Sequence, residues 1–286
     1  MNAMQRLLMP DLLRLLALFG IAVVNVQYIA FSALQYFARP VVHSGLDSIT
    51  LWLVNGLALL KTYGLFAFLF GVGFGLLMRS AASRGPPLPH LYRNRMLGLL
   101  ILGSIHGCLF FPGDILSTYA IMGSVLTLFR AWSPRRLVGL GGLLLLLQVP
   151  IAVPLLLAMP ETPQELLLLE QQLLHEGDFP SVVAFRSISY ALLLPGLLIV
   201  QGTAALGWFC LGLAAVKAGL MDDPDHRLWR QARRWCLIPG VFGSLTAAAI
   251  WQWGAILPGA LITIAIAPLT TLGYLGGIAW LARTSG

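Results

Sequence analysis

Charged residues are scarce in this sequence. Asp, Glu, Lys and Arg make up 10% of its 286 residues, against about 25% in soluble proteins. Apolar and aromatic residues with Cys make up 58% of the chain, and the mean hydropathy is +0.84. A chain with so few charges cannot cover a globule in water. The composition therefore excludes a water-soluble enzyme and a disordered protein.

Cysteines and acidic residues are also few. The sequence has 3 Cys, and 11 Asp and Glu stand against 18 Lys and Arg, which leaves a net charge of +7. The cysteines are too few for a disulfide framework and lack the spacing of a metal site, so we expect no metal. In a membrane protein a positive excess marks cytoplasmic loops that face anionic lipid. We therefore expect membrane lipids, and no nucleic acid, as partners.

Several catalytic motifs are missing. The sequence contains no Walker A pattern, no His-Glu-x-x-His and no Gly-x-Ser-x-Gly. These patterns mark nucleotide hydrolysis, zinc proteases and serine hydrolases, respectively. The sequence supports none of these three activities.

Long apolar stretches dominate what is present. A bilayer core of about 30 Å needs roughly 20 apolar residues in a helix. Such stretches cover residues 12–34, 49–78, 96–111, 115–129, 137–159, 187–216, 235–253 and 255–282. The sequence predicts an all-α, polytopic transmembrane helix bundle of about eight spans, which forms a single domain over residues 1–286.

The basic residues predict the orientation of this bundle. Arginines and Lys217 gather in every second connection, between spans two and three, four and five, and six and seven. The alternate connections are poor in Lys and Arg, and the one after span five is acidic. The positive-inside rule then places both termini in the cytoplasm, which agrees with an even number of spans.

One segment outside the spans reads as a helix. Thr162-Pro163-Gln164-Glu165 has the pattern of a capping box. Leu166, Leu169 and Leu173 then form an apolar stripe at helical spacing. We expect a short amphipathic helix over residues 161–176 on the outer face of the membrane.

Glycine pairs spaced four residues apart predict close helix packing. Gly71 with Gly75, Gly103 with Gly107, and Gly273 with Gly277 each form a small face on an apolar stretch. We interpret these faces as packing surfaces inside the bundle. They are also surfaces through which copies of the chain could form a homo-oligomer.

Polar residues within the spans mark candidate sites, because polar side chains are costly in lipid and turn to the protein interior. By the expected topology, the candidate site residues all lie at middle or outer depth: Asn25, Gln27, Lys61, Tyr63, His106, Asp114 and Tyr119. We expect Asn25, Lys61, His106 and Asp114 to converge on one cavity. His106 and Asp114 flank a tight turn at Pro112-Gly113, so a hydrogen bond that orients the imidazole and raises its basicity is feasible.

Structural roles remain open for each of these residues. His106 could be a hydrogen-bonded core residue, and Asp114 could cap the helix that follows it. Lys61 could pair with Asp47 or Asp114, or reach toward a membrane interface. Asn25 could join two helices by a hydrogen bond.

Several short motifs resemble the YeiB family of bacterial inner-membrane proteins. They are Asp11-Leu-Leu-Arg14, Lys61-Thr-Tyr63, Arg93-Asn-Arg95, His106 with Gly113-Asp114-Ile-Leu, and Lys217-Ala-Gly219. The resemblance is strongest from Asp11 to about Arg136. It implies a multi-pass protein of the cell inner (plasma) membrane. Family members usually carry further C-terminal spans, so the sequence is expected to be a short homologue or a piece of a longer protein.

The family in turn resembles the transmembrane acyltransferase superfamily, which includes heparan-α-glucosaminide N-acetyltransferase. The resemblance implies acyl-CoA from the cytoplasm as donor and an unknown acceptor at the outer face. His106 would be the general base or a covalent acyl carrier, with Asp114 orienting it. The substrate-binding residues would be Asn25, Gln27, Lys61, Tyr63 and Tyr119, of which Asn25, Lys61 and Tyr63 could stabilise an oxyanion. Arg93 and Arg95 would bind the phosphates of CoA.

Two other functions fit the same residues. A transporter of a small polar or amphipathic solute would use the polar cluster as a midplane substrate or proton site. A scaffold would use it only for packing.

Overall fold

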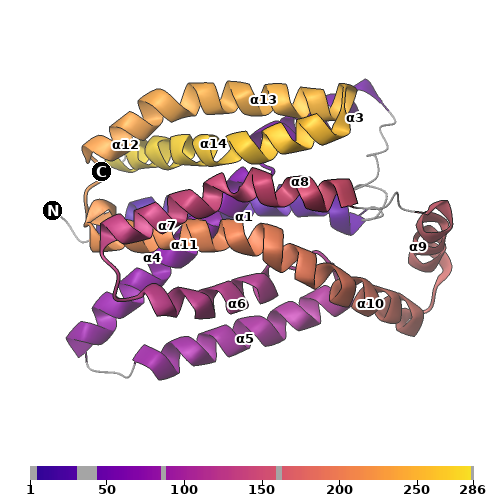
Figure 1. Cartoon of the computed structure of the whole chain (residues 1–286), viewed down its shortest axis with the longest axis horizontal. Helices are drawn as coiled ribbons and strands as arrows, with labels where there is room; N and C mark the ends of the chain where they lie inside the picture. Colours follow the sequence, from indigo (N-terminus) through magenta and orange to yellow (C-terminus); the bar gives the residue numbers. More distant parts are fainter. Residues whose placement is uncertain (1–4, 31–43, 85–87, 159–162, 285–286) are drawn as a thin grey trace.

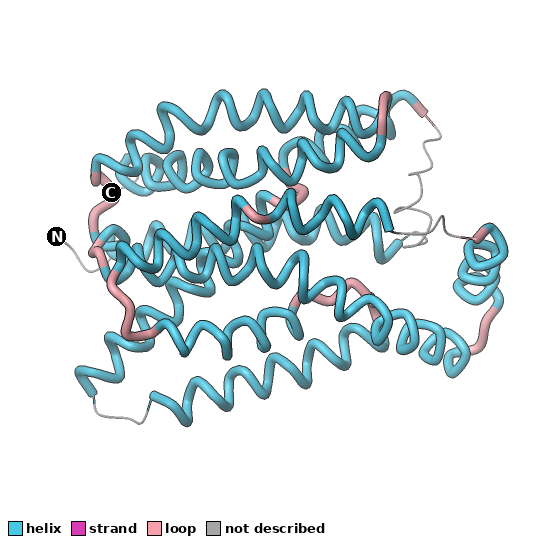
Figure 2. The backbone as a smooth tube through the Cα atoms, viewed as in Figure 1, coloured by secondary structure: helices cyan, strands magenta, loops and turns pink. Residues whose placement is uncertain are grey.

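Helices make up nearly all of the described chain (Figure 2). The computed structural model describes residues 5–30, 44–84, 88–158 and 163–284, and no strand occurs among them. Most helix axes run along one direction (Figure 1). The predicted all-α transmembrane bundle is therefore confirmed.

The helices follow the apolar stretches of the sequence. The first half of the chain forms α1 (Gln5–Ala30), α3 (Gly45–Leu57), α4 (Lys61–Arg84), α5 (Leu88–Leu109), α6 (Leu116–Leu126), η1 (Thr127–Phe129) and α7 (Pro134–Leu146). The second half forms α8 (Gln148–Ala158), α9 (Gln164–Glu176), α10 (Phe179–Leu197), η2 (Leu198–Gly202), α11 (Thr203–Lys217), η3 (Leu220–Asp222), α12 (Arg227–Ala232), η4 (Arg233–Leu237), α13 (Ile238–Trp253) and α14 (Ile256–Thr284).

Six helical segments of the described chain are long and apolar enough to cross a membrane. They are Leu8–Val26, Gly45–Ala82, Pro134–Ala158, Phe179–Lys217, Arg227–Trp253 and Ile256–Thr284. The other two expected spans correspond to α5 and to α6 with η1. The first turns of α5 carry Arg93 and Arg95, and α6 with η1 is shorter than a full span. The two form a hairpin along the side of the bundle (Figure 1).

Both termini lie at one end of the bundle (Figure 1). The α6–α7 connection with Arg130 lies at that same end, as do the C-terminal part of α4 and the N-terminal parts of α5, α7 and α12, which carry many of the other arginines. We call it the basic end. The structure thus gathers the termini and the basic connections on one side, as the charge pattern of the sequence requires.

The core forms where α4 packs against α11. A Cβ added to Gly71 would lie 2.1 Å from the Phe209 carbonyl oxygen, and one added to Gly212 would lie 2.1 Å from that of Phe68. Only glycine allows two backbones to approach so closely. The Phe70 and Phe209 rings stack at 4.4 Å between centroids beside this crossing.

The expected span over residues 49–78 is broken between α3 and α4. Leu60 has a φ of 65°, the one positive φ of a non-glycine residue in the described chain. A break inside a membrane frees carbonyl groups that must find partners within the protein. Here the Lys61 Nζ donates to the Asn55 carbonyl at 3.0 Å, and the Tyr274 hydroxyl donates to the Leu57 carbonyl at 3.0 Å.

The break explains where Lys61 points. Its side chain is fully buried and is engaged by the Asn55 carbonyl, so the expectation that it pairs with Asp47 or Asp114 is wrong. Asp47 lies in the first turn of α3, far along the helix from the carbonyls that the break frees.

Helix α9 lies beyond the bundle, at the end opposite the basic end, and crosswise to the other helices (Figure 1). Residues 161 and 162 of the expected helix lie outside the described part of the chain. Asp178 then begins α10 as its N-cap, because its carboxylate accepts a hydrogen bond from the Ser181 amide at 3.1 Å.

The predicted glycine faces pack against other segments of the same chain. Added Cβ atoms at Gly75, Gly103, Gly107 and Gly273 would lie 2.4 to 2.8 Å from atoms of neighbouring helices or of the turn before α6. Gly277 alone of the six has room, because its nearest neighbour is a Leu237 methyl group at 4.0 Å. The predicted packing role therefore applies to five of the six glycines.

Candidate functional site

His106 and Asp114 face each other across the α5–α6 turn. The His106 Nδ1 and the Asp114 Oδ1 are 3.0 Å apart. The Asp114 side chain is completely buried, whereas 33% of the His106 side chain is exposed. The hydrogen bond that the sequence made feasible is therefore present, and it links a buried carboxylate to a partly accessible imidazole.

The second oxygen of Asp114 starts helix α6. The Asp114 Oδ2 accepts a hydrogen bond from the Ser117 amide at 2.8 Å. The capping role and the histidine-orienting role, which the sequence left as alternatives, are thus both filled by one side chain. The cap also fixes the position of the carboxylate that faces His106.

Tyr190 and Gly103 complete the surroundings of Asp114. The Tyr190 hydroxyl on α10 donates to the Ser117 Oγ at 2.7 Å. A Cβ added to Gly103 would lie 2.6 Å from the Asp114 Oδ2 and 2.5 Å from the Ser117 amide nitrogen. The absence of a side chain at residue 103 lets the turn sit against α5.

The exposed side of the imidazole lies near the end of α5. The Phe110 ring stacks near the His106 ring, with 6.0 Å between their centroids. Arg186 on α10 donates to the Leu109 carbonyl at 2.6 Å and so caps the last turn of α5. This places a fixed guanidinium close to the α5–α6 turn.

The arrangement suits proton transfer. An ionised carboxylate can only accept hydrogen bonds, so its partner Nδ1 carries a proton. The His106 Nε2 is then the nitrogen that can accept a proton. A buried carboxylate that holds one tautomer in place is the arrangement that orients a general base.

A second polar group lies between α1, α4 and α6. The Tyr63 hydroxyl donates to the Asn25 Oδ1 at 2.5 Å, and the Tyr119 hydroxyl donates to the Tyr63 carbonyl at 3.2 Å. Three of the predicted substrate-binding residues are therefore joined in one network. Gln27 lies in the same helix as Asn25, and its side chain is outside the described part of the chain.

Tyr63 and Tyr119 line a cavity of about 180 Å³ in the bundle. Three irregular backbone segments meet at it: the α3–α4 break at Leu60, the π-helix η2 through Val200 and Gln201, and Pro268 inside α14. π-Helical turns and helix breaks inside membranes are common where ligands bind.

Gln148 also lines this cavity and satisfies the irregular backbone of η2. With its amide oriented to suit its neighbours, it donates to the Val200 carbonyl at 3.2 Å and accepts from the Ala204 amide at 3.1 Å. The Gln148 side chain thus supplies hydrogen bonds to backbone groups that in a regular α-helix would bond to each other.

None of the four residues expected to converge on one cavity lines the 180 Å³ cavity. The residues that line the 180 Å³ cavity include Tyr63, Tyr119 and Ile115, the neighbour of Asp114, but not His106, Asp114, Asn25 or Lys61. The buried Lys61 instead closes the α3–α4 break. For Lys61 the reason is the broken helix, because the side chain turns back to the Asn55 carbonyl of α3.

The two arginines predicted to bind phosphates point in different directions. Arg93 lines a pocket of about 290 Å³ at the basic end, together with Arg130, Ser124 and Thr127. The Arg95 guanidinium lies 5.1 Å above the centre of the Phe70 ring. Arg93 with Arg130, rather than Arg93 with Arg95, therefore forms the cationic pocket.

No group of three His, Cys, Asp or Glu side chains in the described residues is placed to hold a metal ion. The sequence reasoning missed Tyr190 and Arg186 as parts of the His106 surroundings. Both are polar residues four positions apart on an otherwise apolar stretch, so they share one face of α10. That spacing is the signal that could have found them.

Three curated proteins are similar to part of this chain, and all three are uncharacterized. YxaH of Bacillus subtilis (strain 168) is 33% identical over 141 residues, which is 46% of this chain and 35% of that protein. An uncharacterized 39.9 kDa protein in the amylase 3' region of Bacillus acidopullulyticus is 37% identical over 119 residues, or 42% of this chain and 32% of that protein.

YeiB of Escherichia coli (strain K12) is 32% identical over 157 residues, or 50% of this chain and 39% of that protein. The match thus spans well under half the length of each of these relatives. No family model matches the chain. No solved structure matches it either. The chain is therefore similar to YeiB-like proteins over about half of its length.

Proposed function

We propose that this chain is a YeiB-family membrane protein of the cell inner membrane that transfers an acyl group from acyl-CoA to an acceptor. The observation that carries the proposal is the His106–Asp114 pair at 3.0 Å, with Asp114 buried and His106 partly exposed. A carboxylate fixed by a backbone amide orients the imidazole as a general base. His106 lies in the last turn of α5, and α5 runs from the basic end toward the opposite end of the bundle (Figure 1).

In the proposed reaction, the His106 Nε2 takes the proton from a hydroxyl or amine of the acceptor. The acceptor oxygen or nitrogen forms a bond to the carbonyl carbon of the thioester. The carbon–sulfur bond then breaks, and the departing sulfur takes the proton back from His106. The Arg186 guanidinium, held by the Leu109 carbonyl at the end of α5, adds positive charge near the turn.

The two ends of helix α5 carry residues for the two parts of the proposed reaction. Its beginning carries Arg93, which with Arg130 forms a cationic pocket suited to the phosphates of CoA. Its end carries His106, 13 residues later, which is about 20 Å along a helix. One helix thus joins a candidate site for the donor at the basic end to the candidate base.

The test uses purified protein in lipid nanodiscs with radiolabelled acetyl-CoA. We expect release of free CoA or labelling of the protein, and loss of this activity in His106→Ala. His175→Ala is the matched control, because His175 lies on α9, away from the proposed site. Full activity in a folded His106→Ala protein would refute the proposed base.

A second candidate function, transport of a small polar solute, has its own supporting observation. The 180 Å³ cavity has polar groups from Tyr63, Gln148 and Gln201, and it lies where three backbone irregularities meet. Uptake into proteoliposomes that persists in His106→Ala and is lost in Gln201→Leu would favour transport over acyl transfer.

A further inference from the structure

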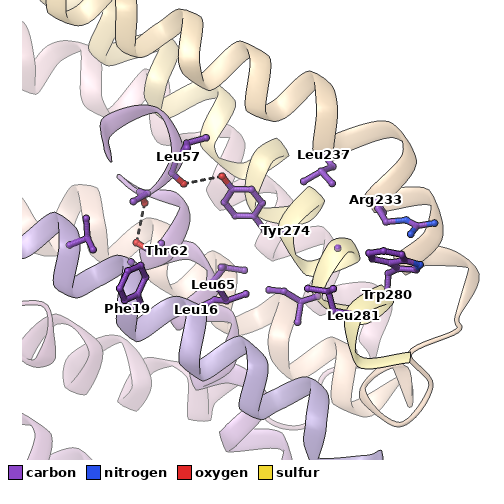
Figure 3. A pocket seen from close by; sticks show the side chains of 15 residues that line it. Leu16, Phe19, Leu57, Thr62, Leu65, Arg233, Leu237, Tyr274, Trp280 and Leu281 are labelled. Atoms are coloured by element: carbon purple, nitrogen blue, oxygen red, sulfur yellow. Dashed lines mark hydrogen bonds between the residues drawn. The ribbon is translucent and has the colours of Figure 1, made fainter. Parts of the chain in front are cut away.

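A groove of about 640 Å³ runs along the outside of the bundle between α1, the α3–α4 break and α14 (Figure 3). It is separate from the His106 surroundings and from the 180 Å³ cavity, and it does not depend on the proposed function. Leu16 and Phe19 of α1 form one wall, and Leu281 and Trp280 of α14 lie at one end.

The groove offers almost no hydrogen bonds to a ligand. The Thr62 hydroxyl already donates to the Ala58 carbonyl at 3.0 Å, and the Tyr274 hydroxyl already donates to the Leu57 carbonyl at 3.0 Å (Figure 3). The remaining walls are aliphatic or aromatic except at Arg233. A polar solute would gain nothing here, whereas a hydrocarbon chain would bury apolar surface.

The groove opens toward lipid. Apolar side chains along it are strongly exposed on the described surface, with Phe19 at 68%, Trp280 at 44% and Leu16 at 40%. Such an exposed apolar surface on a membrane-spanning bundle faces the hydrocarbon of the bilayer. The occupant can therefore enter sideways from the membrane.

The length of the groove fits one leaflet. Along α14 its lining runs from Tyr274 to Leu281, which is about 10 Å of helix. Half of a bilayer core of about 30 Å is about 15 Å. Because Leu281 lies near the C-terminal end of α14, the groove extends from the basic end toward the middle of the membrane.

Arg233 lies at the end of the groove that is nearest to the basic end of the bundle. The Arg233 guanidinium lies 5.0 Å above the Trp280 ring and forms no ion pair within the part of the chain that the structure describes. Tryptophan and arginine at this depth are typical of the headgroup region. The surrounding α12–η4 segment is also basic, with Arg227, Arg230 and Arg234.

We propose that this groove is a binding site for an anionic phospholipid of the leaflet at the basic end. One acyl chain lies in the groove, and the phosphate group lies on Arg233. An anionic lipid fits better than a zwitterionic one. The arginines of α12 and η4 would repel the positively charged amine of a zwitterionic headgroup, which an anionic lipid lacks.

The first test changes the volume of the groove. Gly277→Leu places a side chain in the groove without a clash, because only a Leu237 methyl group lies within 4.0 Å of its Cβ position. Gly139→Leu on α7 is the matched control, since its Cβ position meets nothing within 4 Å and lies outside the groove. If Gly277→Leu does not fold, Leu16→Trp fills the groove from α1.

The second test changes its charge. Arg233→Gln removes the cation, and Arg136→Gln is the matched control, because Arg136 is exposed on α7 and does not line the groove. One lost contact between a basic residue and an anionic lipid surface is expected to lower the preference for that lipid about fivefold.

The measurement is native mass spectrometry of each protein released from nanodiscs that contain equal phosphatidylglycerol and phosphatidylcholine with identical chains. We expect the unaltered protein to retain phosphatidylglycerol. We expect Gly277→Leu to retain less of both lipids, Arg233→Gln to show a preference that is about fivefold weaker, and both controls to behave like the unaltered protein. Equal retention by the unaltered protein, the two variants and the two controls would overturn the proposal.

Displacement of phosphatidylglycerol by an equal concentration of palmitoyl-CoA would also overturn it. That result would indicate that the groove binds the acyl chain of an acyl-CoA donor.

Discussion

Asp114 serves two partners at once, the His106 imidazole and the backbone of α6. The 3.0 Å contact to His106 and the 2.8 Å contact to the Ser117 amide use different carboxylate oxygens. Substitutions at this residue can therefore separate an orienting role from a capping role, because an amide can replace only one of the two.

Asp114→Asn is expected to keep the cap and lose the orientation of the imidazole. Asparagine caps helices about as well as aspartate, so the melting temperature should change little. Turnover should fall, but by less than the factor of about 10²–10⁴ expected for His106→Ala, since the base itself remains. The measurement is activity per folded molecule beside the melting temperature. A large loss of stability with unchanged turnover per folded molecule would instead indicate that the carboxylate is structural.

Gly103 and Gly98 provide a matched pair on one helix. Gly103→Ala forces a methyl group to within 2.6 Å of the Asp114 carboxylate, and such overpacking typically costs about 1–3 kcal/mol. Gly98→Ala meets nothing within 4 Å and should stabilise α5 by about 0.5–1 kcal/mol. Thermal unfolding in detergent compares the two. Equal effects of the two alanines would contradict the close contact between α5 and the α6 turn.

At the scale of elements, the break between α3 and α4 is the feature that periodicity could not reveal. The apolar pattern continues through residues 49–78, and the residues Ala58 to Leu60 contain neither proline nor glycine. The break depends on partners that are distant in the sequence, above all Tyr274. The sequence marked Lys61 as a polar residue inside an apolar span. In the structure its Nζ donates a hydrogen bond to the Asn55 carbonyl at the break.

The two lysines of the chain test this role against each other. The Lys61 Nζ donates to the Asn55 carbonyl inside the bundle, and the Lys217 Nζ donates to the Arg130 and Trp132 carbonyls at the basic end. Lys61→Met leaves a buried carbonyl without its donor, which should cost about 1–3 kcal/mol. Lys217→Met should cost less, because water can reach its exposed partner. Denaturation in mixed micelles measures both, and the reverse order would contradict the assigned role of Lys61.

At the scale of the whole molecule, the structure separates a basic end from the end that carries α9 (Figure 1). Positive-inside orientation would place the basic end in the cytoplasm and α9 outside. This orientation follows from charge alone, so it is open to a direct labelling experiment.

Two single cysteines, placed in a background without native cysteine, test the orientation. Glu176 on α9 and Thr284 at the end of α14 are both exposed. A membrane-impermeant maleimide added to spheroplasts should label Glu176→Cys, and it should label Thr284→Cys only after permeabilisation. Labelling of Thr284→Cys in intact spheroplasts would reverse the orientation.

The fold class and the common side of the termini and basic helix ends could be predicted from the sequence, and the hydrogen bond between His106 and Asp114 could be predicted as feasible. Each follows from local rules: apolar length, loop charge, and two side chains that flank one short turn. The α3–α4 break, the π-helix at the cavity and the contact of Tyr190 with Ser117 were decided by the tertiary structure alone. They join residues up to 217 positions apart, and only the packing of distant helices can supply a partner for each freed backbone group.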